Sequence, residues 1–248
     1  MRSSPVEVIS QRVIRAWCAR QVKQHIDVTI EGLDRIPSTG PVLIAARHYH
    51  HLYDGCLLLT NVPRPTHLLV GLDWVPNRAI RAAMETACHA ARWPIVLRSD
   101  AESAIGGQNA STNVYHANER NQYLRRAVRD AVSVLRDGHV LVIFPEGYPN
   151  IDPVHTPKVG DDDFLPFQSG AAKIVAIAQR DSQTRVAIVP AGLSYQRGPR
   201  WQVTLRFGEP LYLDRPSQGV AVLSAVEDQV HRLSAPLTPS GHPSVSLA

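Results

Sequence analysis

The sequence predicts an α/β fold, with a mixed, largely parallel sheet flanked by helices and an amphipathic helix at the N-terminus. Continuously apolar segments of strand length, such as "PVLIAA" and "HVLVIFPEG", alternate with helical segments along the chain. Such apolar runs are typical of strands buried on both faces, as in parallel sheets. The 248 residues, 44% of them hydrophobic, are enough for one domain of this class with an appended element.

The first half of the chain gives strands and helices in alternation. The segment 27–32 alternates apolar and polar residues, 37–40 has the composition of a turn, and 41–46 is a buried strand. Four elements are expected next: a helix over 54–62, a strand over 66–74, a helix over 77–91 and a short strand over 93–98. The polar, aperiodic stretch from Ser99 to Glu119 is expected to be a long surface loop.

The second half continues the alternation. A helix is expected over 120–138, where Gly138 stops it, and a strand over 139–147 follows. The later elements are a helix from Ser169, a buried strand over 184–195, an alternating strand over 201–213 with a Gly-Glu-Pro break, and a helix over 219–236. The predicted organisation is a helix in residues 1–27, one α/β domain in residues 28–235 and a disordered tail in residues 236–248.

The N-terminal helix has two possible roles. Apolar residues recur at helical spacing and basic residues complement them: Val6, Ile9, Val13 and Trp17 against Arg12, Arg15, Arg20 and Lys23. The apolar side can pack on the domain core, or it can enter a membrane interface with Trp17 as a boundary anchor and the arginines on anionic headgroups.

Charge and cysteine usage narrow the functional classes. The formal net charge of +4 favours anionic surfaces or substrates and does not require nucleic acid as a partner. The three cysteines, Cys18, Cys56 and Cys88, have no paired spacing, which argues against a disulfide framework or a cysteine zinc site and fits a reducing cytosol. Without a long apolar run or a signal core, the protein is expected to be soluble or peripherally attached.

Polar residues gather at the carboxyl ends of predicted strands. The stretch "ARHYHHLYDGC" follows one buried strand, Arg98 ends another, Glu146 and Gly147 end a third, and Pro190 lies in a fourth. Ligands of open α/β sheets bind outside the carboxyl ends of the strands. Because several such groups converge, we expect a site there.

The histidine cluster allows three interpretations. His48, His50, His51 and Asp54 are possible metal ligands, but no HExxH-type arrangement is present. The histidines can instead cap and solvate the start of a helix. In the third interpretation, one histidine is a general base that Asp54 orients. No serine or cysteine lies in a GxSxG elbow, so the nucleophile would be a substrate hydroxyl.

Five blocks in order resemble the glycerolipid acyltransferases typified by bacterial 1-acylglycerol-3-phosphate acyltransferase. The similar segments, between about Ile30 and Leu213, are "GLDRIPSTGPVLIAARH" with "YDGCLLL", then "WPIVLR", "VIFPEGYPN" with "LPFQSGAAKIV", "AIVPAGLSY" and "FGEP". The resemblance implies transfer of a fatty acyl group from acyl-CoA or acyl-ACP, as co-substrate, to a hydroxyl of a lysophospholipid or related glycerolipid. It implies no further cofactor and no metal, and a role in phospholipid biosynthesis.

The resemblance also implies residue roles. His48 would be the base, with His50 as the alternative, and Asp54 its orienting acid. Arg98, Glu146 and Gly147 would bind the phosphate or polar head of the acceptor, and the block around Pro190 would shape the acyl-donor side. A guanidinium suits phosphate because it can bind in a bidentate way.

Two departures from the family pattern bear on these roles. Five residues separate His48 from Asp54 where the family has four, and the strict position is occupied by Tyr49. Tyr148, Pro149 and Asn150 replace the usual threonine, arginine and serine, which removes one basic ligand.

The expectation is therefore an acyltransferase at the inner, cytoplasmic face of the cell membrane, with the membrane surface and possibly acyl carrier protein as partners. The alternatives are a metal-dependent phosphate or ester hydrolase that uses the histidines, and an inactive lipid-binding module.

Overall fold

The computed structural model describes residues 4–72, 75, 77–97, 117–180 and 185–236. Among these residues, seven strands form one mixed sheet in the order β1-β8-β7-β2-β6-β3, with β9 paired to β7. Its strands are β1 Ile26–Glu31, β2 Val42–Ala46, β3 Thr66–Leu68, β6 Val140–Ile143, β7 Ala187–Gln196, β8 Trp201–Phe207 and β9 Leu211–Tyr212. The predicted α/β fold with a mixed, largely parallel sheet is confirmed, because only the β7–β8 and β7–β9 pairs are antiparallel.

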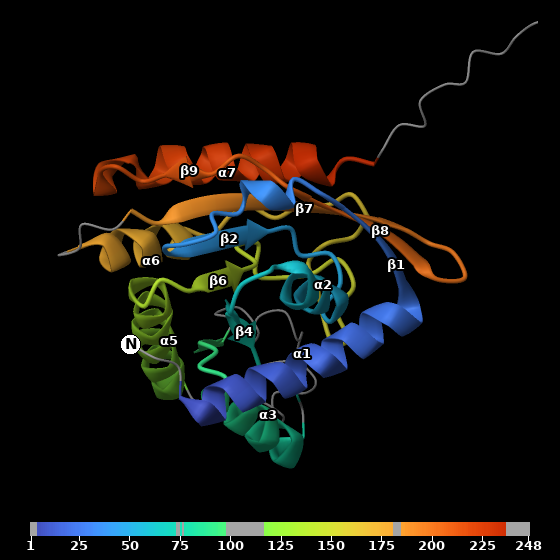
Figure 1. Cartoon of the computed structure of the whole chain (residues 1–248), viewed down its shortest axis with the longest axis horizontal. Coiled ribbons are helices and arrows are strands. Elements are labelled where there is room, and N and C mark those ends of the chain that lie inside the picture. Colours follow the sequence, from blue (N-terminus) through green and yellow to red (C-terminus); the bar gives the residue numbers. More distant parts are fainter. Residues whose placement is uncertain (1–3, 73–74, 76, 98–116, 181–184, 237–248) are drawn as a thin grey trace, which may run out of the picture.

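Both faces of the sheet are covered by helices, which explains why its central strands are apolar at every position. All five residues of β2 are buried, and alternate residues point to opposite faces. Leu43 and Ala45 join a core with residues of α5 Ala117–Arg136, α6 Gly170–Gln179 and α7 Gly219–Ser234. Val42 and Ile44 join a second core with α2 Tyr53–Asn61. Figure 1 shows α7 along one side of the sheet and α1 along the opposite side.

The segment predicted as one strand over 66–74 is two strands in different sheets. β3 pairs with β6 in the main sheet, whereas β4 Val70–Gly71 pairs with β5 Ile95–Val96 in a separate two-stranded sheet. The change of partner occurs at Leu69, whose N–H still donates to Val142 O, while the next N–H donates to Pro94 O. The short strand predicted over 93–98 is present as β5, at Ile95–Val96 and in the small sheet, and Arg98 lies outside the described residues.

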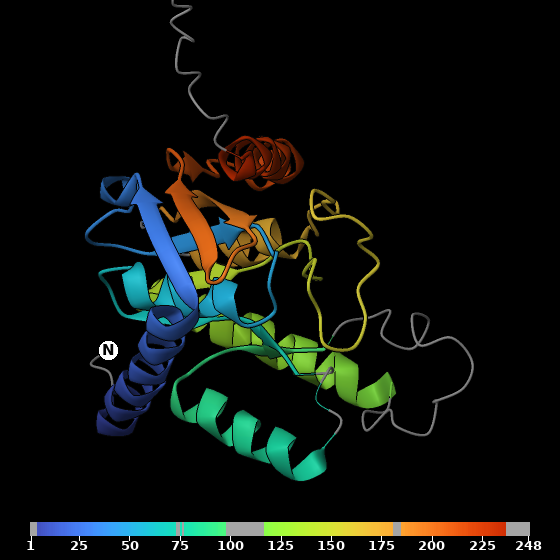
Figure 2. The same ribbon diagram turned by 90° about the vertical axis from the view of Figure 1, so that its right-hand side faces the viewer.

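The small sheet and α3 Arg78–Ala90 form an extension of the domain. Leu72, Cys88 and Ile95 make its apolar cluster, with Met84 and Trp93 packed against them. Both views place α3 at the end of the molecule farthest from α7 (Figure 1 and Figure 2). Residues 98–116, which include Arg98 and most of the predicted long loop, lie outside the described part of the chain, as do residues 237–248 of the predicted tail.

Helix α1 Pro5–His25 does not turn its apolar stripe toward the core. Val6, Ile9, Val13 and Trp17 are each between 49% and 64% exposed. The opposite side of the helix packs on the domain, where Cys18 contacts Cys56 and Leu59 and the Arg15 guanidinium donates to the carbonyls at the end of α2. The alternative in which the stripe packs on the domain core is therefore wrong. Within the described residues, no helix is both long and apolar enough to cross a membrane.

Candidate active site

His48, which follows β2, contacts Asp54 in the first turn of α2. The two side chains are joined by a contact of 2.9 Å between His48 Nδ1 and Asp54 Oδ2. Since an ionised carboxylate can only accept, Nδ1 is the donor in this contact, and in the neutral ring Nε2 then has the lone pair. The backbone N–H groups of Tyr49 and His50 donate to the same oxygen at 2.6 and 2.9 Å. The chain thus bends around the carboxylate, and this bend accommodates the five intervening residues.

The second oxygen of Asp54 is held by a residue of β7, the strand next to β2. Tyr195 O–H donates to Asp54 Oδ1 at 2.6 Å. Strand β7 reaches the carboxylate because it continues beyond the end of β2: Ala46 is in register with Ala191, four residues before Tyr195. Burial and the Asp54 charge raise the pKa of Tyr195 well above its ordinary value, so its hydroxyl stays protonated and can donate.

His50, the alternative base, has a different role in the structure. Its Nδ1 accepts the backbone N–H groups of Leu52 and Tyr53 at 3.2 and 3.4 Å, at the start of α2. Burial lowers the pKa of His50 to about 4, so the ring stays neutral and keeps this lone pair. The cap interpretation therefore describes His50. The ring of His51 lies 3.2 Å from Ile151 O, so the three histidines do not converge on one point.

Glu146 lies beside His48 because β2 and β6 are parallel neighbours whose carboxyl ends meet. Its Oε1 accepts the His48 N–H at 2.8 Å. Its Oε2 accepts Lys158 Nζ at 2.6 Å and the Leu165 N–H at 3.0 Å. Both carboxylate oxygens are thus bonded to protein donors, and the predicted contact of Glu146 with an acceptor stays a prediction.

Gly147 and Pro190 differ in their relation to the site. Gly147 has a φ of +80° and lines the pocket described below, and a Cβ there would lie 2.8 Å from the Gln168 side chain. Pro190 is buried inside β7, where the antiparallel neighbour changes from β9 to β8. Proline has no backbone N–H, and at this position neither β8 nor β9 is paired with it. The Pro190 carbonyl accepts the Gly208 N–H. Pro190 is not among the residues that line the pocket.

A largely apolar pocket of about 450 Å³ opens beside His48. Its wall includes apolar and thiol side chains from α1, α2, β3, α3 and the segment before β5: Trp17, Cys18, Leu59, Leu68, Met84 and Trp93. The His48 ring lines it too, is 14% exposed, and stacks on Phe144 with the ring centroids 4.2 Å apart. With Nδ1 engaged by Asp54, Nε2 is the nitrogen left for a substrate.

Sequence patterns did not single out Tyr195 or Lys158. Tyr195 ends a buried strand, and that position was a usable signal, since the other site residues were found by it. Lys158 lies in an irregular segment between β6 and α6, where periodicity says nothing about contacts.

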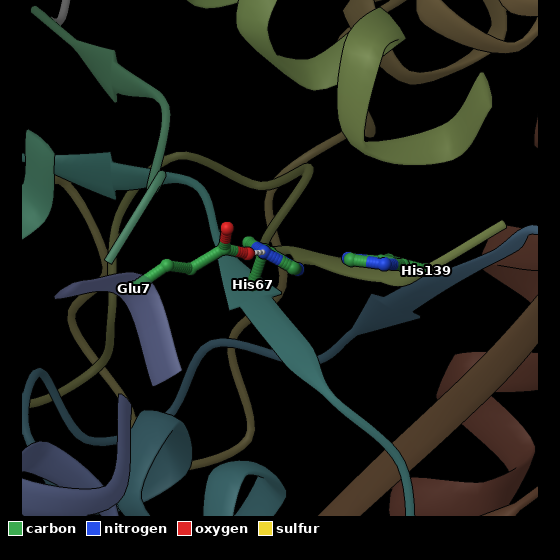
Figure 3. A group of neighbouring side chains, drawn as sticks. All are labelled: Glu7, His67 and His139. Carbon is green, nitrogen blue, oxygen red and sulfur yellow. Dashed lines mark hydrogen bonds and ion pairs between the residues drawn. The ribbon is translucent and has the colours of Figure 1, made fainter. Parts of the chain in front are cut away.

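A second polar cluster lies under α1, and Figure 3 shows Glu7 pointing from this helix toward His67 of β3, with the His139 ring beside it. Ligand atoms of the three lie within 4.8 Å of one another, which invites a test as a metal site. Glu7 Oε1 accepts from His67 Nε2 at 3.2 Å, and the Arg92 guanidinium lies 3.7 Å from Glu7 Oε2. Because a cation already shares this carboxylate, the cluster fits an ion-pair network that docks α1 better than a metal site.

Comparison with known proteins agrees with this geometry. The acyltransferase family profile matches residues 27–194. Among solved structures, the chain is similar to the crystal structure of PlsC, the 1-acyl-sn-glycerophosphate (LPA) acyltransferase from Thermotoga maritima. The TM-score is 0.57 and the identity 18%, over 92% of this chain and 81% of that chain. No curated protein matches the sequence significantly.

The likeness to PlsC concerns the fold, and the family profile covers more than half of the chain. The resemblance predicted from the five sequence blocks is confirmed, and the hydrolase and non-enzymatic alternatives are set aside. The chain belongs to the acyltransferase family.

Proposed function

We propose that this enzyme transfers a fatty acyl group from acyl-CoA or acyl-ACP to a hydroxyl of a lysophospholipid or related glycerolipid, with His48 as general base. The observation that carries the proposal is the contact of 2.9 Å between Asp54 and Nδ1 of His48, whose ring lines an apolar pocket. An acyl chain fits such a lining, since each buried methylene contributes about 0.8 kcal/mol.

The proposed reaction needs no acyl-enzyme. His48 Nε2 takes the proton of the acceptor hydroxyl while its oxygen attacks the thioester carbonyl carbon. Asp54 holds the ring in one tautomer and stabilises the imidazolium that forms. When the tetrahedral intermediate collapses, the carbon–sulfur bond breaks and the imidazolium returns its proton to the thiolate. The products are the ester and the free thiol.

We further propose that the exposed stripe of α1 attaches the enzyme to the cytoplasmic face of the membrane. Ile9, Val13 and Trp17 are exposed together with Arg12 and Arg20, which is the composition of an interfacial helix. Trp17 also lines the pocket, so an acyl chain entering from the membrane would pass beside this helix.

The catalytic assignment is tested by thiol release from acyl-CoA and acyl-ACP with a panel of lysophospholipids, glycerol 3-phosphate and lipid polyols. His48→Ala is expected to lower kcat by about 1,000-fold, within the range that general-base catalysis contributes. His50→Asn, the matched control, is expected to retain kcat within about threefold, because the ring of His50 is turned to the start of α2. Wild-type kcat in His48→Ala would refute the assignment.

The membrane assignment is tested by sedimentation with anionic vesicles. The double variant Ile9→Gln/Val13→Gln is expected to lose at least half of the binding. Val220→Gln is the matched control, because Val220 is also an exposed apolar residue but lies on α7, on the opposite side of the molecule (Figure 1). Equal binding by both variants would rule out α1 as the attachment surface.

A further inference from the structure

Lys158 places a buried ammonium group within hydrogen-bond distance of the His48 carbonyl. Its Nζ donates to His48 O at 2.8 Å and to Asn150 Oδ1 at 3.1 Å, and it pairs with Glu146 Oε2 at 2.6 Å. An ammonium has three N–H donors, so these partners use all of them. The Lys158 and Glu146 side chains are both 0% exposed. Lys158 is therefore not available to a substrate and acts on the protein itself.

Regular secondary structure does not hold His48 in place. β2 ends at Ala46, the Arg47 N–H makes its last backbone bond to β7, and α2 begins only at Tyr53. Instead, the N–H of His48 donates to Glu146 and its C=O accepts from Lys158. One ion pair thus binds both backbone groups of the residue whose ring faces the pocket.

Stability alone does not explain this arrangement. Burial lowers the pKa of Lys158, and the neighbouring Glu146 opposes this shift without cancelling it, so the ion pair offsets only part of its desolvation. An apolar pair of similar volume often stabilises a protein as well or better. The charged pair adds a fixed direction for the two hydrogen bonds to the His48 backbone. Such fixing matters in catalysis, because a misplacement of about 1 Å can cost about 100-fold in rate.

We propose that Lys158 is a positioning residue for acyl transfer, which holds His48 in line with Asp54 and the pocket through the His48 carbonyl and Glu146. This proposal rests on the proposed role of His48 as the base. It assigns Lys158 no contact with substrate.

The segment that carries Lys158 is itself built to present it. The Asn150 side-chain amide donates to the carbonyls of Gly160 and Asp163, while its oxygen accepts from Lys158. The Asp163 carboxylate accepts the N–H groups of Val159 and Gly160 and closes the turn after Lys158. Asn150 therefore connects the turn that follows Lys158 to the Lys158 ammonium group.

The test compares Lys158→Met with the double variant Glu146→Gln/Lys158→Met. The single variant leaves a buried carboxylate unpaired and is expected to lose both thermal stability and activity. The double variant removes both charges and keeps an amide oxygen for the His48 N–H. We expect it to recover most of the midpoint temperature of the wild type, while kcat stays about 100-fold lower and KM for the acyl donor changes less than twofold.

Arg64→Met is the matched control. The Arg64 guanidinium also ties loop carbonyls together, those of Pro37, Gly40 and Gly138, but it does so at the amino ends of β2 and β6. We expect this variant to lose thermal stability and to retain wild-type kcat. Comparison with the Lys158 variants distinguishes a general loss of loop stability from a specific loss of His48 positioning.

A second readout does not depend on activity. The Nδ1 proton of His48, bonded to Asp54, should give a low-field proton resonance in the wild type and in Arg64→Met, and should broaden or vanish in both Lys158 variants. A double variant with wild-type kcat and an unchanged resonance would overturn the positioning role. If the wild type transfers no acyl group to any acceptor, the proposed function fails, and the resonance still reports whether Lys158 positions the ring.

Discussion

The molecule contains two histidine–carboxylate pairs that look alike in isolation and differ in their surroundings. The nitrogen–oxygen distance is 2.9 Å in His48–Asp54 and 3.2 Å in His67–Glu7. The His48 side chain is 14% exposed and lines the pocket, whereas that of His67 is 0% exposed. His48 follows the end of β2, but His67 lies inside β3, in register with Leu141. A short contact between a histidine and a carboxylate therefore does not by itself make a base.

The partners of the two carboxylates explain the difference. Asp54 lies only six positions from its histidine, at the start of α2, and is fixed by backbone donors and Tyr195. Glu7 comes from α1, and it pairs with His67 of β3 and with Arg92 at the end of α3. The first arrangement holds one ring toward a cavity. The second joins a helix to the body of the domain, so its role lies in stability.

The largest predicted effect separates the two pairs by activity. Asp54→Asn is expected to lower kcat by about 1,000-fold or more, since an amide favours the wrong tautomer of the histidine. Glu7→Gln is expected to leave kcat within about threefold and to lower the free energy of unfolding instead, because it weakens a buried charged network. Steady-state kinetics and urea unfolding of both variants check this. We call His67–Glu7, whose side chains are almost inaccessible to solvent, the sealed pair. Equal loss of kcat in the two variants would mean that the sealed pair also serves catalysis.

Much of the site could be predicted from the sequence because it follows from strand patterns. Buried strands are recognisable as apolar runs, and parallel strands bring their carboxyl ends together, so His48 and Glu146 were expected to be neighbours. Contacts between residues far apart in the sequence were not predictable in the same way. Glu7 and His67 lie 60 positions apart, and Lys158 and His48 lie 110 apart. No local pattern encodes contacts that form only when the elements pack.

Helix α1 illustrates the limit of periodicity. The spacing of Val6, Ile9, Val13 and Trp17 showed that they share one side of a helix, but not which side faces the domain. The polar residues Glu7 and Gln11 decide this, because their partners His67 and Ala91 lie in the body of the protein. A polar contact with a buried histidine thus overrides the simple rule that apolar sides turn inward.

The next effect tests the sealed pair by pH. Burial lowers the pKa of His67 from its ordinary 6.5 to about 4; His139 and Arg92 act in the same direction, and Glu7 opposes them. Between pH 6.5 and pH 4 the unfolded chain therefore binds a proton that the folded protein does not. Stability is retained above pH 6.5 and falls as the pH decreases toward 4, with His67 accounting for about 3 kcal/mol.

Urea unfolding at pH 7, 5.5 and 4.5 measures this slope. His67→Gln is expected to be less stable than the wild type at pH 7 and to have a shallower decline, because glutamine does not titrate. His50 shares the direction of the shift and remains in both proteins, so it cancels in the comparison. A variant with the same slope as the wild type would show that folding does not lower the pKa of His67.

The smallest effect concerns single hydroxyl and amide contacts at the edge of each pair. Tyr195→Phe removes the O–H that donates to Asp54 Oδ1, while His48 and two backbone N–H groups still hold Oδ2. We expect kcat to fall by about 3- to 10-fold, which corresponds to about 1 kcal/mol, the net worth of one hydrogen bond.

Gln11→Ala is the counterpart in the sealed pair, where the side-chain amide lies 3.0 Å from His67 Nε2 and donates to Ala91 O. It is expected to lower the free energy of unfolding by about 1 kcal/mol and to leave kcat unchanged. If Tyr195→Phe changed only stability, the hydroxyl would serve merely to satisfy a buried oxygen, and the backbone turn would be sufficient to aim Asp54 at His48.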